Sequence, residues 1–151
     1  MKKSNINDIK KLREKTSASI MECRKALEKA SGDKNKAEKL ISQWGIKKAT
    51  KKEGRKTAEG IIEAYIHADK KTGILIQLNC ETDFVARTDD FQKLAHEIAM
   101  QIAAMKPKKV EDLLKQKYIR DNNITIETLV KQAVGTLGEN ITIANFLILE
   151  I

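Results

Sequence analysis

The residues that could do chemistry in this chain gather in one short stretch, NCETDFVAR, at positions 79–87. Glu81 and Asp83 are two carboxylates close in sequence, and paired carboxylates can act as general acid and base. An acid/base enzyme is therefore one hypothesis. The adjacent Asp83 and Phe84 support another, because an aromatic side chain presented outward supplies a large contact area for a protein partner. The pattern alone leaves open whether Phe84 is buried or presented.

Asp89 and Asp90 are better explained by a helix that starts beside them. Side-chain oxygens at a helix N-terminus accept hydrogen bonds from its free N–H groups, and negative charge there is favoured by the helix dipole. We therefore predict that these two aspartates, rather than Asp83, cap the helix that begins with DDFQKLAHEI.

Motifs for metal, nucleotide or covalent chemistry are missing from the sequence. The helix segment HEIAM has Met100 where a zinc-protease motif needs a second histidine, and only two histidines, His67 and His96, are present. Cys23 and Cys80 lack companions at metal-ligand spacing. Neither a phosphate-binding G-x-x-x-x-G-K-[ST] nor a G-x-S-x-G motif occurs. We predict no catalytic residue, no metal site and no cofactor, and a protein that is not an enzyme.

Charge is divided unevenly along the chain. Residues 1–56 hold 18 Lys and Arg against 7 Asp and Glu, whereas residues 57–151 hold 11 against 14. The basic third makes RNA or ribosome binding a competing hypothesis. However, nucleic-acid modules usually combine charge with aromatic residues or glycine-rich clamps, and Trp44 is the only aromatic residue there. We favour a solvated lysine-rich face, or one that meets an acidic protein, and expect no specific nucleic acid.

Nothing in the sequence indicates a membrane. No apolar run approaches the roughly 18 to 20 residues that span a bilayer, and no apolar segment of a signal peptide follows Lys2 and Lys3. Two cysteines far apart are typical of free thiols in a reducing compartment. We expect a cytoplasmic protein, or one in the matrix or stroma of an organelle, without a membrane partner.

The first 45 residues predict a bundle of three short helices, with Asp33 as N-cap of the third and Gly45 at its end. The predicted apolar stripes are Ile6, Ile9 and Leu12, then Ile20, Cys23, Ala26, Leu27 and Ala30, and finally Ala37, Leu40, Ile41 and Trp44. Residues 46–60 are basic, with almost nothing to bury, and predict a connector with a helical start.

From residue 61 the apolar period changes from 3.6 to 2, which predicts strands. Residues 61–67 and 74–79 form a predicted β-hairpin around the turn DKKTG. Residues 141–151 predict a long strand, apolar on both faces near its end, that is either central in its sheet or buried in a partner. Asn79 and Cys80 are expected to finish the strand before the motif.

Three helices are predicted between these strands. The first is long, buries Phe91, Leu94, Ala95, Ile98, Ile102 and Met105, and is closed by Pro107. A short one follows near VEDLLKQKYI, and the last runs from an N-cap at Thr125 to Gly138. The second half is thus an α+β unit: three antiparallel strands with helices packed on one face.

Four segments resemble the elongation factor Ts family: LREKTSASIMECRKALEKASGD (12–33), KATKKEGRKTAEGII (48–62), LNCETDFVAR (78–87) and GENITI (138–143). The resemblance implies a ubiquitin-associated-like three-helix domain at 1–45, a basic connector at 46–60 and an α+β core at 61–151. Its members are guanine nucleotide exchange factors of elongation factor Tu in bacteria and organelles. The implied partner is elongation factor Tu, GDP-bound and nucleotide-free.

The resemblance also implies a mechanism and contact residues. The Asp-Phe pair of the family, here Asp83 and Phe84, enters the partner near its Mg²⁺ and phosphate site and wedges partner helices apart without covalent chemistry. GDP then leaves and GTP binds. The contacts that carry over are Thr82, Asp83, Phe84 and Val85, then Arg13, Ile20, Met21 and Arg24, and finally Lys52, Leu137 and Gly138. For Ile20 and Met21 burial in the bundle core is the alternative.

The sequence departs from the family pattern in three places. Thr16-Ser17-Ala18-Ser19-Ile20-Met21 stands where the family has T-G-A-G-M-M, and Ala144 and Asn145 replace two arginines. The stretch between residues 107 and 125 is short, as in members with a single core. A single core with an apolar strand at 141–151 favours pairing with a second copy, and we hypothesise a homodimer.

Overall fold

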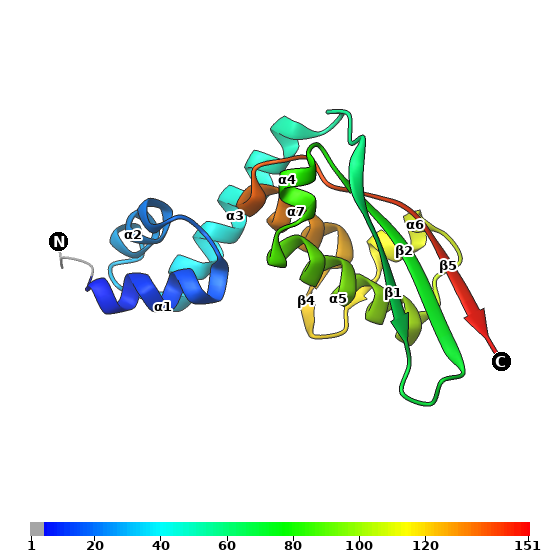
Figure 1. Cartoon of the computed structure of the whole chain (residues 1–151). Helices are drawn as coiled ribbons and strands as arrows, with labels where there is room; N and C mark the ends of the chain where they lie inside the picture. Colours follow the sequence, from blue (N-terminus) through cyan, green and yellow to red (C-terminus); the bar gives the residue numbers. More distant parts are fainter. Residues whose placement is uncertain (1–4) are drawn as a thin grey trace.

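A computed structural model describes residues 5–151, and Lys2 and Lys3 lie outside this range. The fold is α+β, as predicted: a helical N-terminal part is followed by a sheet with helices (Figure 1). The helices are α1 (Ile6–Thr16), α2 (Ile20–Lys29), α3 (Lys34–Lys52), α4 (Asp83–Ala86), α5 (Asp89–Met105), α6 (Val110–Lys115) and α7 (Ile126–Leu137). The strands are β1 (Glu59–Ile66), β2 (Thr72–Cys80), β3 (Lys117–Tyr118), β4 (Asp121–Thr125) and β5 (Thr142–Glu150). No helix in the described part of the chain is both long and apolar enough to cross a membrane.

The N-terminal helices bury a small core of their own. Leu12, Cys23, Ala26 and Leu27 are buried there, as the stripes predict, and Trp44 packs against them while half-buried. The prediction was wrong for two residues at helix N-termini, because Ile6 and Ile20 are exposed.

We predicted that the third helix ends at Gly45, but it continues to Lys52. Asp33 is its N-cap and accepts a hydrogen bond from the N–H of Lys36, as expected. A glycine inside a helix costs only about 1 kcal/mol relative to alanine, so tertiary packing can override it. That packing is supplied by α7, where Gly135 crosses α3 at Gly45 (Figure 1).

The main sheet has three antiparallel strands in the order β1-β2-β5. The hairpin β1–β2 and the end of β2 at Cys80 are confirmed. Of the two alternatives for residues 141–151, the central strand was wrong, because β2 is central and β5 is an edge strand, and burial in a partner stays a prediction. In register, Ala64 faces Leu75, and Leu75 faces Leu147 across the sheet.

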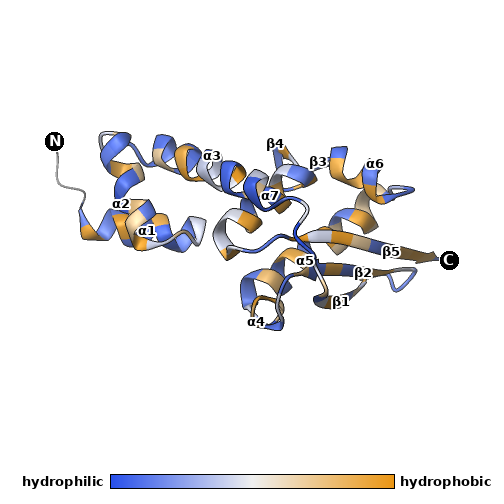
Figure 2. Cartoon of the chain, turned by 90° about the horizontal axis from the view of Figure 1, so that it is seen from above, coloured by the Kyte–Doolittle hydropathy of each residue, from blue (hydrophilic) through white to orange (hydrophobic). Residues whose placement is uncertain are grey.

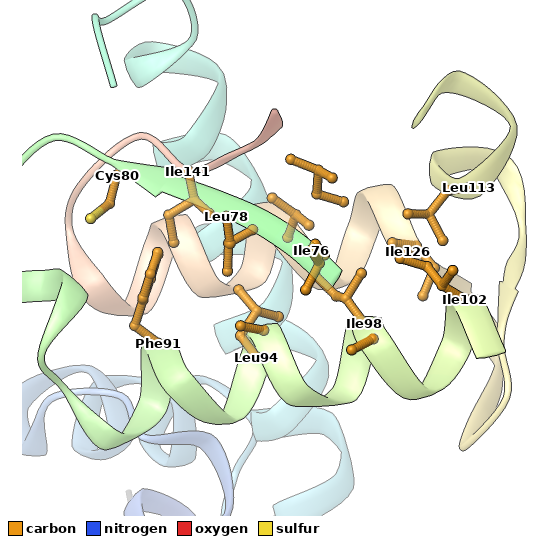
Figure 3. Packing of buried hydrophobic residues seen from close by; sticks show 14 of the residues in the cluster. Ile76, Leu78, Cys80, Phe91, Leu94, Ile98, Ile102, Leu113, Ile126 and Ile141 are labelled. Carbon is orange, nitrogen blue, oxygen red and sulfur yellow. The ribbon is translucent and has the colours of Figure 1, made fainter. Parts of the chain in front are cut away.

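The main core lies between the sheet and its helices. Ile76 and Leu78 of β2 point toward Leu94 and Ile98 of α5 (Figure 3), and Ile74 belongs to the same buried cluster. The predicted buried face of α5 is confirmed except at Met105, which is exposed at the last residue of the helix.

Two helix caps decide the path of the chain around the motif. The N-cap of α5 is Thr88, whose hydroxyl oxygen accepts from the N–H of Phe91. Our prediction that Asp89 and Asp90 provide the cap was wrong, although both lie in the first helical turn, where the dipole favours them. Thr125 and Gly138 bound α7 as predicted.

The hairpin β3–β4 was not predicted. The buried Gln101 of α5 holds it, since its amide donates to the carbonyl oxygen of Lys117 at 3.0 Å and accepts from the N–H of Ile119 at 2.9 Å. The Tyr118 hydroxyl donates to Glu97 at 2.7 Å. Burial of the ring and the adjacent Glu97 raise the pKa of Tyr118. These contacts fix a short segment that has little apolar pattern of its own.

The sheet face away from α5 is apolar and uncovered in this chain. Five large side chains on it are exposed: Ile62, Ile66, Leu75, Leu147 and Leu149. The view coloured by hydropathy shows hydrophobic residues along β5 toward the C-terminus (Figure 2). Exposed apolar patches are more typical of contact surfaces than of ordinary solvated faces.

Candidate functional site

Helix α4 presents the aromatic residue of the motif to solvent. It has only four residues, begins directly after the turn that follows β2, and is capped by Thr82, whose hydroxyl oxygen accepts from the N–H of Val85. Ala86 is buried and Val85 packs half-buried against the main core. Phe84 therefore points away from the core, and its side chain is 82% exposed.

Asp83 is exposed beside it. Its carboxylate pairs with Arg87, one turn later, at 3.2 Å, and both side chains are more than half exposed. Exposed ion pairs of this kind contribute little, in the range of about 0.2–1 kcal/mol. The carboxylate can therefore exchange Arg87 for another partner at small cost.

The predicted second contact of the core lies next to α4. Helix α7 ends at Leu137, and Gly138 follows in the left-handed conformation with φ of 81°, which favours glycine. Glu139 then accepts hydrogen bonds from the backbone of Glu81 and Thr82. The structure thus brings residues 137–138 together with residues 82–85.

The predicted N-terminal contacts lie on α1 and α2. Arg13 is exposed, and Arg24 is ion-paired with Glu28 at 3.0 Å. Ile20 and Met21, at the start of α2, are 56% and 69% exposed, so the alternative of burial in the bundle core was wrong for both. Ser19 and Glu22 form a capping box that holds this helix start.

These two groups of predicted contacts remain on separate parts of the fold. Figure 1 shows α1 and α2 at one end and the three-stranded sheet at the other, joined by α3, with α4 drawn between them. A hollow lies where the N-terminal part meets α5, and it is lined by Lys10, Arg13, Glu14 and Ser17 on one side and by Asp90 on the other. Lys52, the last residue of α3, is half-buried and belongs to neither group.

Cys80 and the acidic residues of the motif have structural partners. The Cys80 thiol is buried and donates to the carbonyl oxygen of Thr82 at 3.1 Å, and burial raises its pKa. Glu81 accepts from the N–H of Asn140 at 2.7 Å. Within residues 5–151 no three acidic, histidine or cysteine side chains are grouped as metal ligands.

Sequence reasoning missed Glu139 and Asn140. Both follow the helix terminator Gly138, where polar residues are expected in any loop, and their partners are nearly sixty positions earlier. No local signal identifies such a contact. The Glu139 side chain and the backbone N–H of Asn140 bind the turn from which α4 starts.

Comparisons with known proteins identify the family of the chain. A family model described as Elongation factor TS matches residues 81–151. Elongation factor Ts of Coprothermobacter proteolyticus is 40% identical over 91% of this chain and 93% of that protein. The protein of the same name from Fervidobacterium nodosum is 38% identical over 95% of both chains. Elongation factor Ts, chloroplastic, of Guillardia theta is 41% identical over 91% of this chain and 84% of its own length.

The first of these alignments spans 183 positions, more than the 151 residues of this chain. The bacterial relative therefore carries residues that have no counterpart here, in line with the short stretch noted between residues 107 and 125. The likeness nevertheless extends over nearly the full length of both proteins. At this identity and coverage, the chain belongs to the elongation factor Ts family of translation elongation factors.

Proposed function

We propose that this chain promotes release of GDP from elongation factor Tu by inserting Asp83 and Phe84 beside the Mg²⁺ and phosphate site of that partner, after which GTP binds. The observation that carries the proposal is the exposure of Phe84 at the start of α4, next to neighbours that face the core. A large aromatic side chain that is exposed to solvent can bury a large apolar area in a partner. Such residues often contribute most of the binding free energy of an interface.

Asp83 supplies the second part of the wedge. A carboxylate is an oxygen ligand of the kind that Mg²⁺ prefers, and its negative charge repels a phosphate group nearby. The weak pairing with Arg87 leaves it free to do both. In this proposal Phe84 displaces partner side chains while Asp83 disturbs the groups that hold Mg²⁺ and the β-phosphate.

Binding at a second surface keeps the wedge in place. In the proposal residues 1–45 and 61–151 act as two modules joined by the connector 46–60, whose first part is the end of α3. Arg13, Ile20, Met21 and Arg24 contact the partner from the N-terminal module. Leu137 and Gly138 complete the interface beside Thr82 and Val85, and Lys52, at the end of α3, adds a separate contact. The exposure of Ile20 and Met21 supports this assignment.

The proposed exchange needs no covalent step. It is a coupling of two binding equilibria: if this chain weakens GDP binding by some factor, GDP weakens binding of this chain by the same factor. Nucleotide-free partner is therefore bound most tightly, and GTP completes the cycle by displacing this chain.

We propose two further properties of the same protein. It works where its relatives translate, in a bacterial cytoplasm or inside an organelle, since the relatives named above include bacterial and chloroplastic proteins. It also forms a homodimer through the outer face of the sheet. That face is supported as an interface by its five exposed large apolar residues.

Stopped-flow release of a fluorescent GDP analogue from elongation factor Tu tests the exchange activity. We expect the wild-type chain to accelerate release and Phe84→Ala to lose most of that acceleration. Ile6→Ala, which truncates an equally isolated exposed side chain on α1, is the control and should match wild type. If wild type gives no acceleration, the proposed function is wrong. A folded Phe84→Ala variant with the wild-type rate would refute the wedge alone.

A further inference from the structure

Two loops that are distant in sequence are joined by a set of hydrogen bonds around Glu139. One carboxylate oxygen of Glu139 accepts from the backbone N–H groups of Glu81, at 3.0 Å, and Thr82, at 2.9 Å. The other accepts from the Thr82 hydroxyl. The loop between α7 and β5 thereby holds the turn between β2 and α4.

The next residue returns the contact and adds a third segment. The N–H of Asn140 donates to the Glu81 carboxylate at 2.7 Å, and its side-chain amide donates to the carbonyl oxygen of Arg55 at 2.8 Å. Asn140 is buried, so these bonds are shielded from water. We call this group the clasp; its members are Arg55, Glu81, Thr82, Glu139 and Asn140.

The clasp controls where α4 begins. The Thr82 hydroxyl donates to Glu139, while its oxygen accepts from the N–H of Val85 and so caps α4. The hydrogen-bonded path therefore runs from the loop after α7 into the first turn of α4, which carries Asp83 and Phe84. Bonds from N–H groups to a carboxylate are about twice as strong as neutral ones.

Few other contacts hold helix α4: Ala86 is buried, Val85 packs half-buried against the main core, and the Thr88 hydroxyl donates to the carbonyl oxygen of Val85 at 2.7 Å. A helix of four residues has no stability of its own, because forming the first turn costs more than its hydrogen bonds return. Ala86 is the only fully buried side chain in it, and Phe84 adds nothing to the core because it faces water. The orientation of Phe84 must then be set largely from outside the helix.

We propose that Glu139 is a positioning residue for nucleotide exchange: it holds Thr82 so that Asp83 and Phe84 are presented in one fixed orientation. Because Glu139 directly follows Leu137 and Gly138, it also joins the two predicted contact segments of the core into one rigid surface. The inference rests on the proposed exchange function and adds a residue that does not itself touch the partner.

The expected effect follows from preorganisation. A wedge that samples many orientations must be ordered on each encounter, and a displacement of about 1 Å can cost on the order of 100-fold in rate. We expect Glu139→Ala to slow the stimulated release of GDP by about tenfold or more. Glu139→Gln keeps an oxygen acceptor for the backbone N–H groups and should stay within about threefold of wild type.

Stopped-flow GDP release with wild type, Glu139→Ala and Glu139→Gln tests the rates. Glu111→Ala is the matched control, since it removes an exposed carboxylate of α6 that is not a member of the clasp. Amide hydrogen exchange of the free protein provides a readout that a general loss of stability would not give. In Glu139→Ala the amides of residues 81–85 should lose protection while those of α5 and β2 up to Leu78 keep theirs.

The outcomes separate this inference from the function on which it rests. No acceleration by wild type removes the proposed function and the inference with it. If wild type accelerates GDP release and folded Glu139→Ala accelerates it equally, the inference about Glu139 is wrong while the proposed function stands. If Glu139→Ala does not fold, Glu139→Asp replaces it, because the shorter side chain keeps the charge but cannot reach both N–H groups. A wild-type rate for folded Glu139→Asp equally overturns the inference.

Discussion

Phe84 and Phe91 are the same residue type seven positions apart, with opposite environments. Phe91 is fully buried between α5 and the sheet, whereas Phe84 faces water. The difference arises from two threonine caps, Thr82 and Thr88, which divide the chain into a short helix and a long one. Each phenylalanine lies in the first turn of its own helix, so the orientation of that helix determines whether the side chain faces the core or the solvent.

These two residues allow a matched prediction of stability. Phe84→Ala should change the free energy of unfolding by no more than about 0.5 kcal/mol, as is usual for surface positions. Phe91→Ala removes a buried ring and should cost about 3–5 kcal/mol. Urea unfolding followed by circular dichroism measures both. Comparable losses for the two variants would show that Phe84 supports the core, contrary to its exposure.

Single residues were predicted well where one local rule applied and poorly where several competed. Asp33 and Thr125 are isolated cap candidates, and both cap the expected helices. At positions 88–90 three oxygen-bearing side chains follow one another, and only Thr88 has the extended backbone of an N-cap. Sequence alone cannot identify the N-cap among these three residues, because its position depends on where the preceding helix, α4, ends.

At the scale of elements, the crossing of α3 and α7 determines how the N-terminal part is attached. A Cβ built on Gly135 would lie 2.3 Å from the Cα of Gly45, which no packing tolerates. A Cβ on Gly45 meets its nearest atom at 3.7 Å, an ordinary contact. The two backbones touch at Gly135, and Ser42 and Gln132 add a side-chain hydrogen bond of 2.6 Å beside the crossing.

The asymmetry between the glycines predicts opposite effects of one substitution. Gly135→Ala should force the helices apart and destabilise the protein by about 1–3 kcal/mol, the usual cost of overpacking. Gly45→Ala should be neutral or should stabilise by up to about 1 kcal/mol, since alanine is the better helix former. Thermal unfolding of both variants measures the difference. Equal melting temperatures would mean that α3 and α7 do not cross as closely as described.

Elements were predicted where their signal is local. The alternation of β1 and β2, with a five-residue loop between them, was sufficient to identify the hairpin. The end of α3 was missed because a glycine is typical of a helix end. The packing of α7 against Gly45, which overrides this preference, is not visible in the local sequence. The place of β5 was missed for a related reason: an apolar strand has the same pattern whether it is central or at an edge with an uncovered face.

At the scale of the whole molecule, the outer face of the sheet remains to be explained. Its exposed residues come from all three strands: Ile62 and Ile66 from β1, Leu75 from β2, and Leu147 and Leu149 from β5. The apolarity of β5 on both faces, which the sequence pattern indicates, is explained if this face is covered by another molecule. A second copy presents the same apolar face, so one two-fold contact covers both.

We therefore expect the wild-type protein to sediment as a dimer at tens of micromolar in equilibrium ultracentrifugation. Leu149→Lys places a charge on the outer face, where the side chain is 78% exposed in the single chain, so the fold should persist while the dimer is lost. Ile6→Lys makes the same change at an exposed position on α1 and should leave the dimer intact. A wild-type protein of monomer mass at these concentrations, or a Leu149→Lys variant that remains dimeric, would exclude the outer face as the interface.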